Sequence, residues 1–131
     1  MHNFRKLDIW IDSVELADTV YVMTDAFPKS EVYGLASQMQ RAAVSVPSNI
    51  AEGSGMDSDR NFSRFLAIAL GSLYELETQV EIAYRRAYIS TENYYSMITH
   101  LESLQKRVYN FRQHIVPEGN DNEDSDYRWS I

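Results

Sequence analysis

The sequence predicts an all-α protein, an antiparallel up-and-down bundle of four helices. Apolar residues recur at steps of three and four in four separate segments, which is the spacing that places them on one face of a helix. None of these segments alternates apolar and polar residues as a half-buried strand does, and none is joined by a two-residue hairpin signal. The helices are expected near residues 5–27, 31–53, 58–88 and 91–116.

The first segment carries two apolar lines. The first is predicted to face the core and comprises Leu7, Trp10, Val14, Ala17, Tyr21 and Thr24. The second comprises Ile9, Leu16, Val20, Met23 and Phe27. Together they are wider than a contact with a single helix needs. Either this helix faces two neighbours within the bundle, or one line faces another subunit.

The second segment contains a proline within its helical pattern. Its core line is Val32, Leu35, Met39, Ala42, Val46 and Ile50. Pro47 removes one backbone hydrogen bond and crowds the carbonyl of Ala43, which bends or ends a helix. We expect one helix bent near Pro47, with Ser30 as its N-cap and Gly53 as a left-handed cap at its end.

The third and fourth segments have clear core lines. The third keeps a heptad spacing through Phe62, Leu66, Ala69, Leu73, Leu76, Val80, Ala83 and Ala87. Gly71 lies in its middle, where glycine weakens a helix, so we expect the second helix to pack closely there. Asp57 or Ser58 caps this helix, and Ser90 or Thr91 caps the fourth. The fourth core line is Tyr94, Met97, Leu101, Leu104, Val108, Phe111 and Ile115.

Composition indicates one bundle domain, residues 1–117, followed by a flexible acidic tail, residues 118–131. The chain has 131 residues, 44% of them hydrophobic, and a formal net charge of −7. The tail holds five acidic residues and one arginine, so the bundle itself is only mildly acidic. That balance disfavours general nucleic-acid binding. The lack of cysteine, of a signal-peptide pattern and of a membrane-length apolar run predicts a cytoplasmic protein that uses no membrane.

A polar seam is predicted beside the core line of the second helix. It comprises Arg41, Ser45, Ser48, Asn49 and Glu52, with Glu75 and Glu77 of the third helix expected level with Arg41. A buried charge is retained only when it is paired. We therefore expect a partly buried ion pair from Arg41 to Glu75 or Glu77. Asn49 and Glu52 are expected to bond to backbone near Pro47 or Gly53, while the alternative is an exposed recognition surface.

Two pairs of basic residues are the candidate phosphate contacts. Arg85 and Arg86 end the third helix, while Lys106 and Arg107 lie within the fourth, about 20 Å away along the bundle. They form no single patch in a monomer, but copies in a ring could align them into a basic band. The alternative is solvated cations that pair with Glu81 or Glu102.

Known catalytic arrangements are absent from the sequence. His2, His100 and His114 do not follow a glutamate by three, as a di-iron bundle requires, and they form no zinc motif. The chain has no phosphate-binding glycine loop, and Ser45, Ser48, Ser63 and Ser72 have no histidine near them in the sequence. We therefore expect no enzymatic activity, no metal, no cofactor and no small-molecule substrate.

The sequence resembles a known bacterial family at several ordered motifs. These are YGL at 33–35, QRAAVSVPSNIAEG at 40–53, Phe65-Leu66 and ALGSLYELETQ at 69–79. They are similar to the bacterial four helix bundle family, also known as the 23S rRNA intervening-sequence proteins. The family usually has a second arginine where this chain has Gln40.

The resemblance implies an antiparallel four-helix bundle, often assembled into a ring, with no established enzymatic activity. A distant relative in architecture is the accessory protein of diversity-generating retroelements, a basic pentamer that works with a reverse transcriptase and nucleic acid. The function expected from the residues and the resemblance together is that of a homo-oligomeric binding or scaffold protein, in a ring such as a pentamer. The alternative is an RNA- or DNA-associated accessory protein that acts as a ring.

Overall fold

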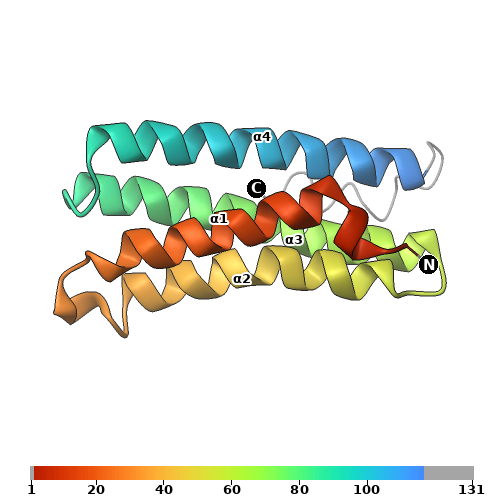
Figure 1. The fold of residues 1–131 in the computed structure, drawn as a ribbon, viewed down its shortest axis with the longest axis horizontal. Coiled ribbons are helices and arrows are strands. Elements are labelled where there is room, and N and C mark those ends of the chain that lie inside the picture. Colours follow the sequence, from red (N-terminus) through yellow and green to blue (C-terminus); the bar gives the residue numbers. More distant parts are fainter. Residues whose placement is uncertain (1, 117–131) are drawn as a thin grey trace.

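The computed structural model describes residues 2–116, which form four long helices in an up-and-down arrangement (Figure 1). The helices are α1 (Asp8–Asp25), α2 (Leu35–Ser54), α3 (Asp59–Arg85) and α4 (Thr91–Ile115). Two short 3-10 helices precede α1 and α2, η1 (Phe4–Lys6) and η2 (Lys29–Glu31). The predicted fold class is confirmed, and no strand occurs in the part of the chain that is described. The predicted tail, 118–131, lies outside the described residues.

One hydrophobic core runs between the four helices. Antiparallel neighbours turn their apolar faces inward. Among these neighbouring pairs, the contact between α2 and α3 is the most extensive and that between α1 and α4 the smallest. Side chains with no exposed surface come from every helix: Leu16, Val20, Met39, Val46, Ile50, Leu66, Leu73, Leu76, Val80, Leu101, Leu104 and Val108. The heptad line of α3 and the core line of α4 therefore lie where the sequence predicts, apart from Ala87, which is exposed in the turn after α3.

The core line predicted for α1 is wrong in part. Val14 and Tyr21 are 41% and 48% exposed, while the second line supplies the buried Ile9, Leu16 and Val20. Residues two apart on a helix differ by about 200° in direction, so α1 cannot bury both lines in full, and only the small Ala17 and Thr24 of the first line are buried. The line that includes Leu16 and Val20 is the one that faces the core.

Helix α2 runs through Pro47 as a single helix, which confirms one helix rather than two. It begins later than predicted, at Leu35, with Gly34 rather than Ser30 as its N-cap. Because η2 turns the chain first, Val32 is 52% exposed and lies outside the core.

The glycine predictions are wrong at both positions. Gly53 is not a left-handed cap, because α2 continues through it to Ser54. Instead, α3 packs closely against it, since a Cβ atom on Gly53 would lie 2.6 Å from Phe65 Cβ and 2.8 Å from Phe62 Cδ1. Gly71 is exposed, and a Cβ atom there would meet nothing within 4 Å. The close approach therefore lies at the end of α2 and not in the middle of α3.

The caps of α3 and α4 follow the sequence. The hydroxyl of Ser58 accepts a hydrogen bond from the Asn61 N–H, and that of Ser90 accepts one from the Asn93 N–H, each at 3.1 Å. Between these helices, Ala87 adopts a left-handed backbone with φ of 61°. The N–H groups of Ala87 and Tyr88 return to the carbonyls of Tyr84 and Ala83, both at 2.9 Å, which closes the last turn of α3.

Four segments meet at the end of the bundle where the chain begins. The His2 N–H donates to the carbonyl of Ser54 at 3.0 Å, and the His2 ring lies 5.1 Å from the ring of Phe62. Phe62 in turn packs edge-on against Phe111, 5.6 Å away. The N-terminus, the turn from α2 to α3 and the end of α4 lie at the same end of the bundle (Figure 1), and the contacts of His2, Phe62 and Phe111 join them.

Candidate functional site

The predicted polar seam of α2 divides into a bonded half and an exposed half. Ser45 and Asn49 are half-buried and face α3, whereas Arg41, Ser48 and Glu52 are exposed. The hydroxyl of Ser45 hydrogen-bonds the hydroxyl of buried Ser72 at 2.8 Å. The Asn49 amide donates to the carbonyl and the hydroxyl of Ser45, at 2.7 and 2.9 Å. The predicted bond from Asn49 to backbone near Pro47 is therefore confirmed, and a small polar contact joins α2 to α3.

The predicted ion pair of Arg41 is wrong. Arg41 is exposed, and no ion pair joins it to another described residue. Glu75 accepts a hydrogen bond from Gln79 at 3.3 Å, and Glu77 accepts one from Gln105 of α4 at 3.5 Å. Residues two apart on α3 point about 200° away from each other, so Glu75 and Glu77 could not both face α2. Glu52, expected to bond to backbone, is exposed as well.

Gln40 stands where the family usually has an arginine, and its half-buried side chain lies between α1 and α2. Its amide donates a hydrogen bond to the hydroxyl of buried Thr24 at 3.0 Å. A neutral amide can satisfy this hydroxyl without bringing a charge into the half-buried interface. Gln40 therefore links α1 to α2, while the adjacent Arg41 points to solvent.

Three of the four candidate phosphate contacts are already engaged within the chain. Arg85 pairs with Glu81 at 3.4 Å, as the alternative predicted, and Arg86 lies 6.0 Å above the ring of Tyr88. Arg107 pairs with Asp12 of α1, a partner that the sequence did not suggest. Lys106 is exposed. The pairs at residues 85–86 and 106–107 lie on separate parts of the bundle and form no common patch.

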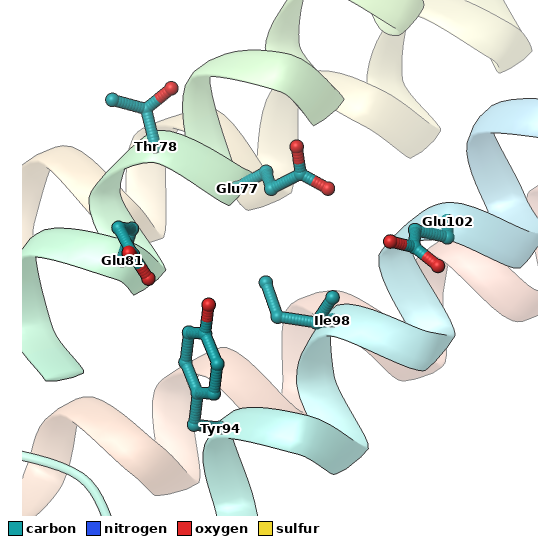
Figure 2. A pocket seen from close by; sticks show the side chains of 6 residues that line it. All are labelled: Glu77, Thr78, Glu81, Tyr94, Ile98 and Glu102. Carbon is teal, nitrogen blue, oxygen red and sulfur yellow. The ribbon is translucent and has the colours of Figure 1, made fainter.

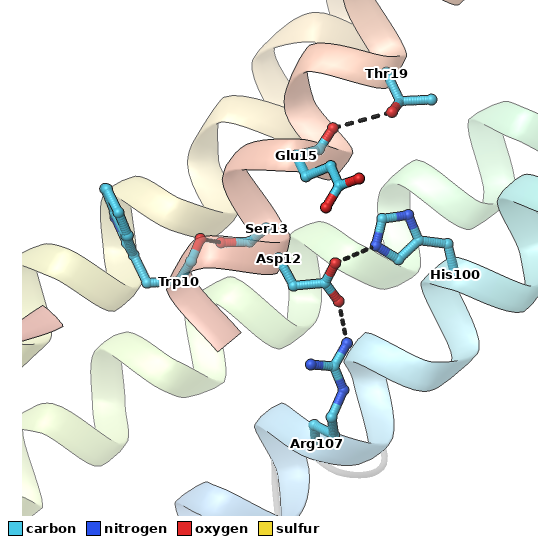
Figure 3. Close-up of polar contacts among 7 residues, drawn as sticks. All are labelled: Trp10, Asp12, Ser13, Glu15, Thr19, His100 and Arg107. Atoms are coloured by element: carbon cyan, nitrogen blue, oxygen red, sulfur yellow. Dashed lines mark hydrogen bonds and ion pairs between the residues drawn. The ribbon is translucent and has the colours of Figure 1, made fainter. Parts of the chain in front are cut away.

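A charged cluster between α1 and α4 is the polar feature that sequence reasoning missed. Asp12 receives two partners from α4 (Figure 3): its Oδ1 lies 2.7 Å from His100 Nε2, and its Oδ2 forms an ion pair with Arg107. Burial raises the pKa of Asp12, but the hydrogen bonds from Arg107 and His100 outweigh this and hold the pKa below its usual value. His100 and Arg107 are seven residues apart, so both lie on one face of α4, a spacing that could have indicated a shared partner.

A groove of about 340 Å³ continues from this cluster along the contact between α1 and α4. Its polar lining includes Glu15, Thr19, Ser96 and His100. In Figure 3 the carboxylate of Glu15 points toward the imidazole of His100. The second ring nitrogen of His100 has no protein partner among residues 2–116, because only Nε2 is bonded, to Asp12. The contacts of Asp12 with His100 and Arg107 join α1 to α4. Among the described residues, no nucleophile is bonded to the imidazole of His100.

A second groove lies between α3 and α4 and is acidic. It measures about 400 Å³ and is lined by Glu77, Glu81, Glu102, Tyr94, Thr78 and Ile98 (Figure 2). The hydroxyl of Tyr94 points toward Glu81, and a hydrogen bond to this carboxylate, with some burial, raises the pKa of Tyr94 to about 12. Tyr94 is therefore a hydrogen-bond donor at neutral pH and not a base. In the described part of the chain, no three histidine or acidic side chains could hold a metal ion.

The fold and these sites define an all-α bundle protein in which several polar side chains bridge neighbouring helices. A model of the 23S rRNA-intervening sequence protein matches residues 5–110. The chain belongs to this family. The expectation from the resemblance is thus confirmed for the family and for the fold.

Two further comparisons set the limits of this assignment. A crystal structure at 1.70 Å resolution from Bacteroides thetaiotaomicron VPI-5482 is described as a protein with unknown function from the S23 ribosomal protein family. It superposes with a TM-score of 0.74 at 24% sequence identity and covers 80% of this chain and 95% of its own, which shows a shared fold. No curated protein matches the sequence. Among the described residues, no helix is long and apolar enough to cross a membrane.

Proposed function

We propose that this protein is a non-enzymatic scaffold that assembles with copies of itself through the outer side of α1. The observation that carries the proposal is the exposed apolar surface there. Ile11, Val14, Tyr21 and Val22 are all at least 41% exposed. Of the ten large apolar side chains exposed among residues 2–116, seven lie between residues 11 and 44. The apolar surface is therefore concentrated on α1, the following turn and α2.

The pattern of α1 supports an interface over an ordinary surface helix. Its inner side supplies Ile9, Leu16 and Val20 to the core, and its outer side exposes four large apolar side chains around Asp18. Apolar side chains gathered on an exposed surface often mark a site of contact with another protein. Within a single bundle, α1 has core contacts on one side only. A second copy of the chain offers the same apolar surface, and closed rings or pairs of identical subunits are the usual arrangement of such contacts.

The alternative function, an RNA- or DNA-associated accessory protein in a ring, has less support from the geometry. In its favour, the family description names the intervening sequence of 23S rRNA. Against this, Arg85, Arg86 and Arg107 already have partners within the chain. Counterion release needs several cations available to phosphate groups.

We also place the protein in the cytoplasm, on the grounds that it contains no cysteine and that its described helices include no membrane span.

Analytical ultracentrifugation of the full chain at micromolar concentration tests the proposal. We expect an oligomer, and we expect the double variant Ile11→Glu, Val22→Glu to be a folded monomer. Ile68→Glu is the matched control, because Ile68 of α3 is 48% exposed and lies away from α1. A wild-type chain that sediments only as a monomer contradicts the proposal. Adding structured RNA at low and physiological salt tests the alternative, which requires binding that persists at physiological salt.

A further inference from the structure

Charges of opposite sign lie on the outer sides of α1 and α2 without meeting within the chain. Asp18 and Asp25 are exposed on α1, and Arg41 is exposed on α2. The two helices pack side by side (Figure 1), yet no ion pair joins any of these three residues to another described residue. Arg85 and Arg107, by contrast, each have a carboxylate partner within the chain. The charges on the outer sides of α1 and α2 are therefore available to a second molecule.

The two acidic residues of α1 flank its most exposed apolar side chain. Asp18, Val22 and Asp25 are spaced by four and three residues, so they form one line on the outer side of the helix. Val22 is 70% exposed, more than any other large apolar side chain of the described helices. The two acidic residues are about 10 Å apart along the helix. This acidic line therefore presents a projecting apolar side chain between two negative charges.

A hollow on the outer side of α2 has the complementary character. It measures about 430 Å³ and is lined by Tyr21 of α1 and by Ser37, Gln40, Arg41, Val44 and Ser45 of α2. Tyr21 and Val44 are 48% and 41% exposed, so both present apolar surface to solvent there. Arg41 is the one charged residue of this described lining. The hollow therefore offers an apolar site next to one positive charge.

We propose that α1 of one copy packs on α2 of a neighbouring copy, with Val22 in the hollow and with Asp18 and Asp25 facing Arg41. This inference rests on the proposed assembly through the outer side of α1, and it names the surface that receives α1. Tyr21 lines the hollow and precedes Val22 directly, so the two surfaces lie at the same height along the bundle. A symmetry axis parallel to the helices keeps each residue at its height, so it can bring Val22 over the hollow without a shift.

Two other exposed apolar surfaces fit the acidic line less well. If α1 packed on α1 of the neighbouring copy, the acidic residues of both copies would gather in one contact, and like charges across an interface oppose association. The outer side of α3 exposes Ile68 and Ile82, but its Arg64 and Arg85 already interact with other groups. Arg41 is therefore the cation that best complements the acidic line.

Charge reversal tests this contact, with sedimentation velocity of the full chain over a range of concentrations as the measurement. Arg41→Glu should weaken assembly about a hundredfold, because it places like charges across the contact. The double variant Asp18→Lys, Asp25→Lys should weaken assembly as well, and the triple variant with all three changes should assemble again. Lys106→Glu makes the matched change at an exposed cation in a groove between α3 and α4, and it should assemble as the wild type does.

The outcomes separate this contact from the assembly on which it rests. If Ile11→Glu, Val22→Glu dissociates the oligomer but Arg41→Glu leaves it intact, α1 packs on another surface. This inference is then wrong, while the proposed function stands. A triple variant that stays monomeric, although circular dichroism shows it to be helical, also overturns the pairing of Arg41 with the acidic line. A wild-type chain that is monomeric overturns both the contact and the proposed function.

Discussion

The contact between α2 and α3 and the contact between α1 and α4 are built from different side chains. Helices α2 and α3 meet through small groups: Gly53 lies under Phe65, and the hydroxyls of Ser45 and Ser72 bond directly. Helices α1 and α4 have a smaller contact than the other neighbouring pairs and are bridged by the long side chains of His100 and Arg107, which meet at Asp12. The first contact depends on shape and should not tolerate added atoms. The second depends on charge and should respond to pH.

The largest effect is expected at Gly53. In Gly53→Ala the new Cβ atom lies 2.6 Å from Phe65 Cβ, an atom fixed near the backbone, so the helices must move apart. Overpacking of this kind costs about 1–3 kcal/mol, and we expect a net loss of roughly 2 kcal/mol in the free energy of unfolding. Gly71→Ala is the matched control in an open site and should gain up to about 1 kcal/mol, because alanine is the better helix former. Urea denaturation measures both, and equal stabilities would contradict the close contact.

The next effect is expected at the charged cluster between α1 and α4. Asp12→Asn removes the charge that both His100 and Arg107 share. Arg107 remains 39% exposed and can turn to water, so the loss should be about 1–2 kcal/mol and not the larger cost of a fully buried pair. Thermal or chemical denaturation at neutral pH measures it. Asp18→Asn, at an exposed position of the same helix, should change little.

The same substitution should change how stability depends on pH. Because the pKa of Asp12 is lowered in the folded protein, its contribution is complete above the ordinary aspartate pKa of about 3.9. It is lost as the pH falls through the lower native pKa. The difference in stability between the wild type and Asp12→Asn should therefore shrink as the pH falls below about 4. A difference that stays constant over this range would show that the carboxylate charge contributes nothing.

A smaller effect is expected at the hydroxyl contact between α2 and α3. Ser45→Ala removes the partner of Ser72 and one of the two acceptors of Asn49. A neutral hydrogen bond of this kind contributes about 1 kcal/mol, and that loss is expected in chemical denaturation. Ser48→Ala, one turn along on the exposed side of α2, should be nearly neutral. If the two variants are equally stable, the contact contributes no stability.

The smallest effect is expected at Arg41. Because this side chain is exposed and has no ion-pair partner among the described residues, Arg41→Ala should change stability by less than about 0.5 kcal/mol. Chemical denaturation measures the change. A loss of several kcal/mol would restore the buried pair that the sequence suggested.

The fold could be predicted from the sequence because periodicity determines which residues share a helix face. The spacing of Leu66, Leu73 and Val80 identified the core line of α3, and Ser58 and Ser90 marked the helix starts. Periodicity alone could not choose between the two lines of α1. That choice depends on which line fits the space left by three other helices, and Leu16 and Val20 occupy it.

The polar contacts could be predicted only where both partners lie close in the sequence. Two such contacts join residues four apart, Arg85 with Glu81 and Asn49 with Ser45. The first was expected as an alternative, and the second as a bond from Asn49 to backbone near Pro47. Asp12 and Arg107 are 95 residues apart, so their contact depends on how α1 and α4 align along the bundle. The ion pair predicted for Arg41 is wrong for the same reason. Its distance from Glu75 depends on the rotation of two helices, which the sequence does not specify.

The turn between α3 and α4 has a consequence for engineering this protein. Ala87 occupies a left-handed position that a glycine would accept without strain, while Gly71 occupies an ordinary helical position that suits an alanine. A left-handed alanine costs on the order of 1 kcal/mol relative to glycine. Exchanging the two residues, by Gly71→Ala together with Ala87→Gly, keeps the amino-acid composition, volume and charge of the chain unchanged. The stability of the bundle thus depends partly on residue order alone, and it could be raised without adding a single atom.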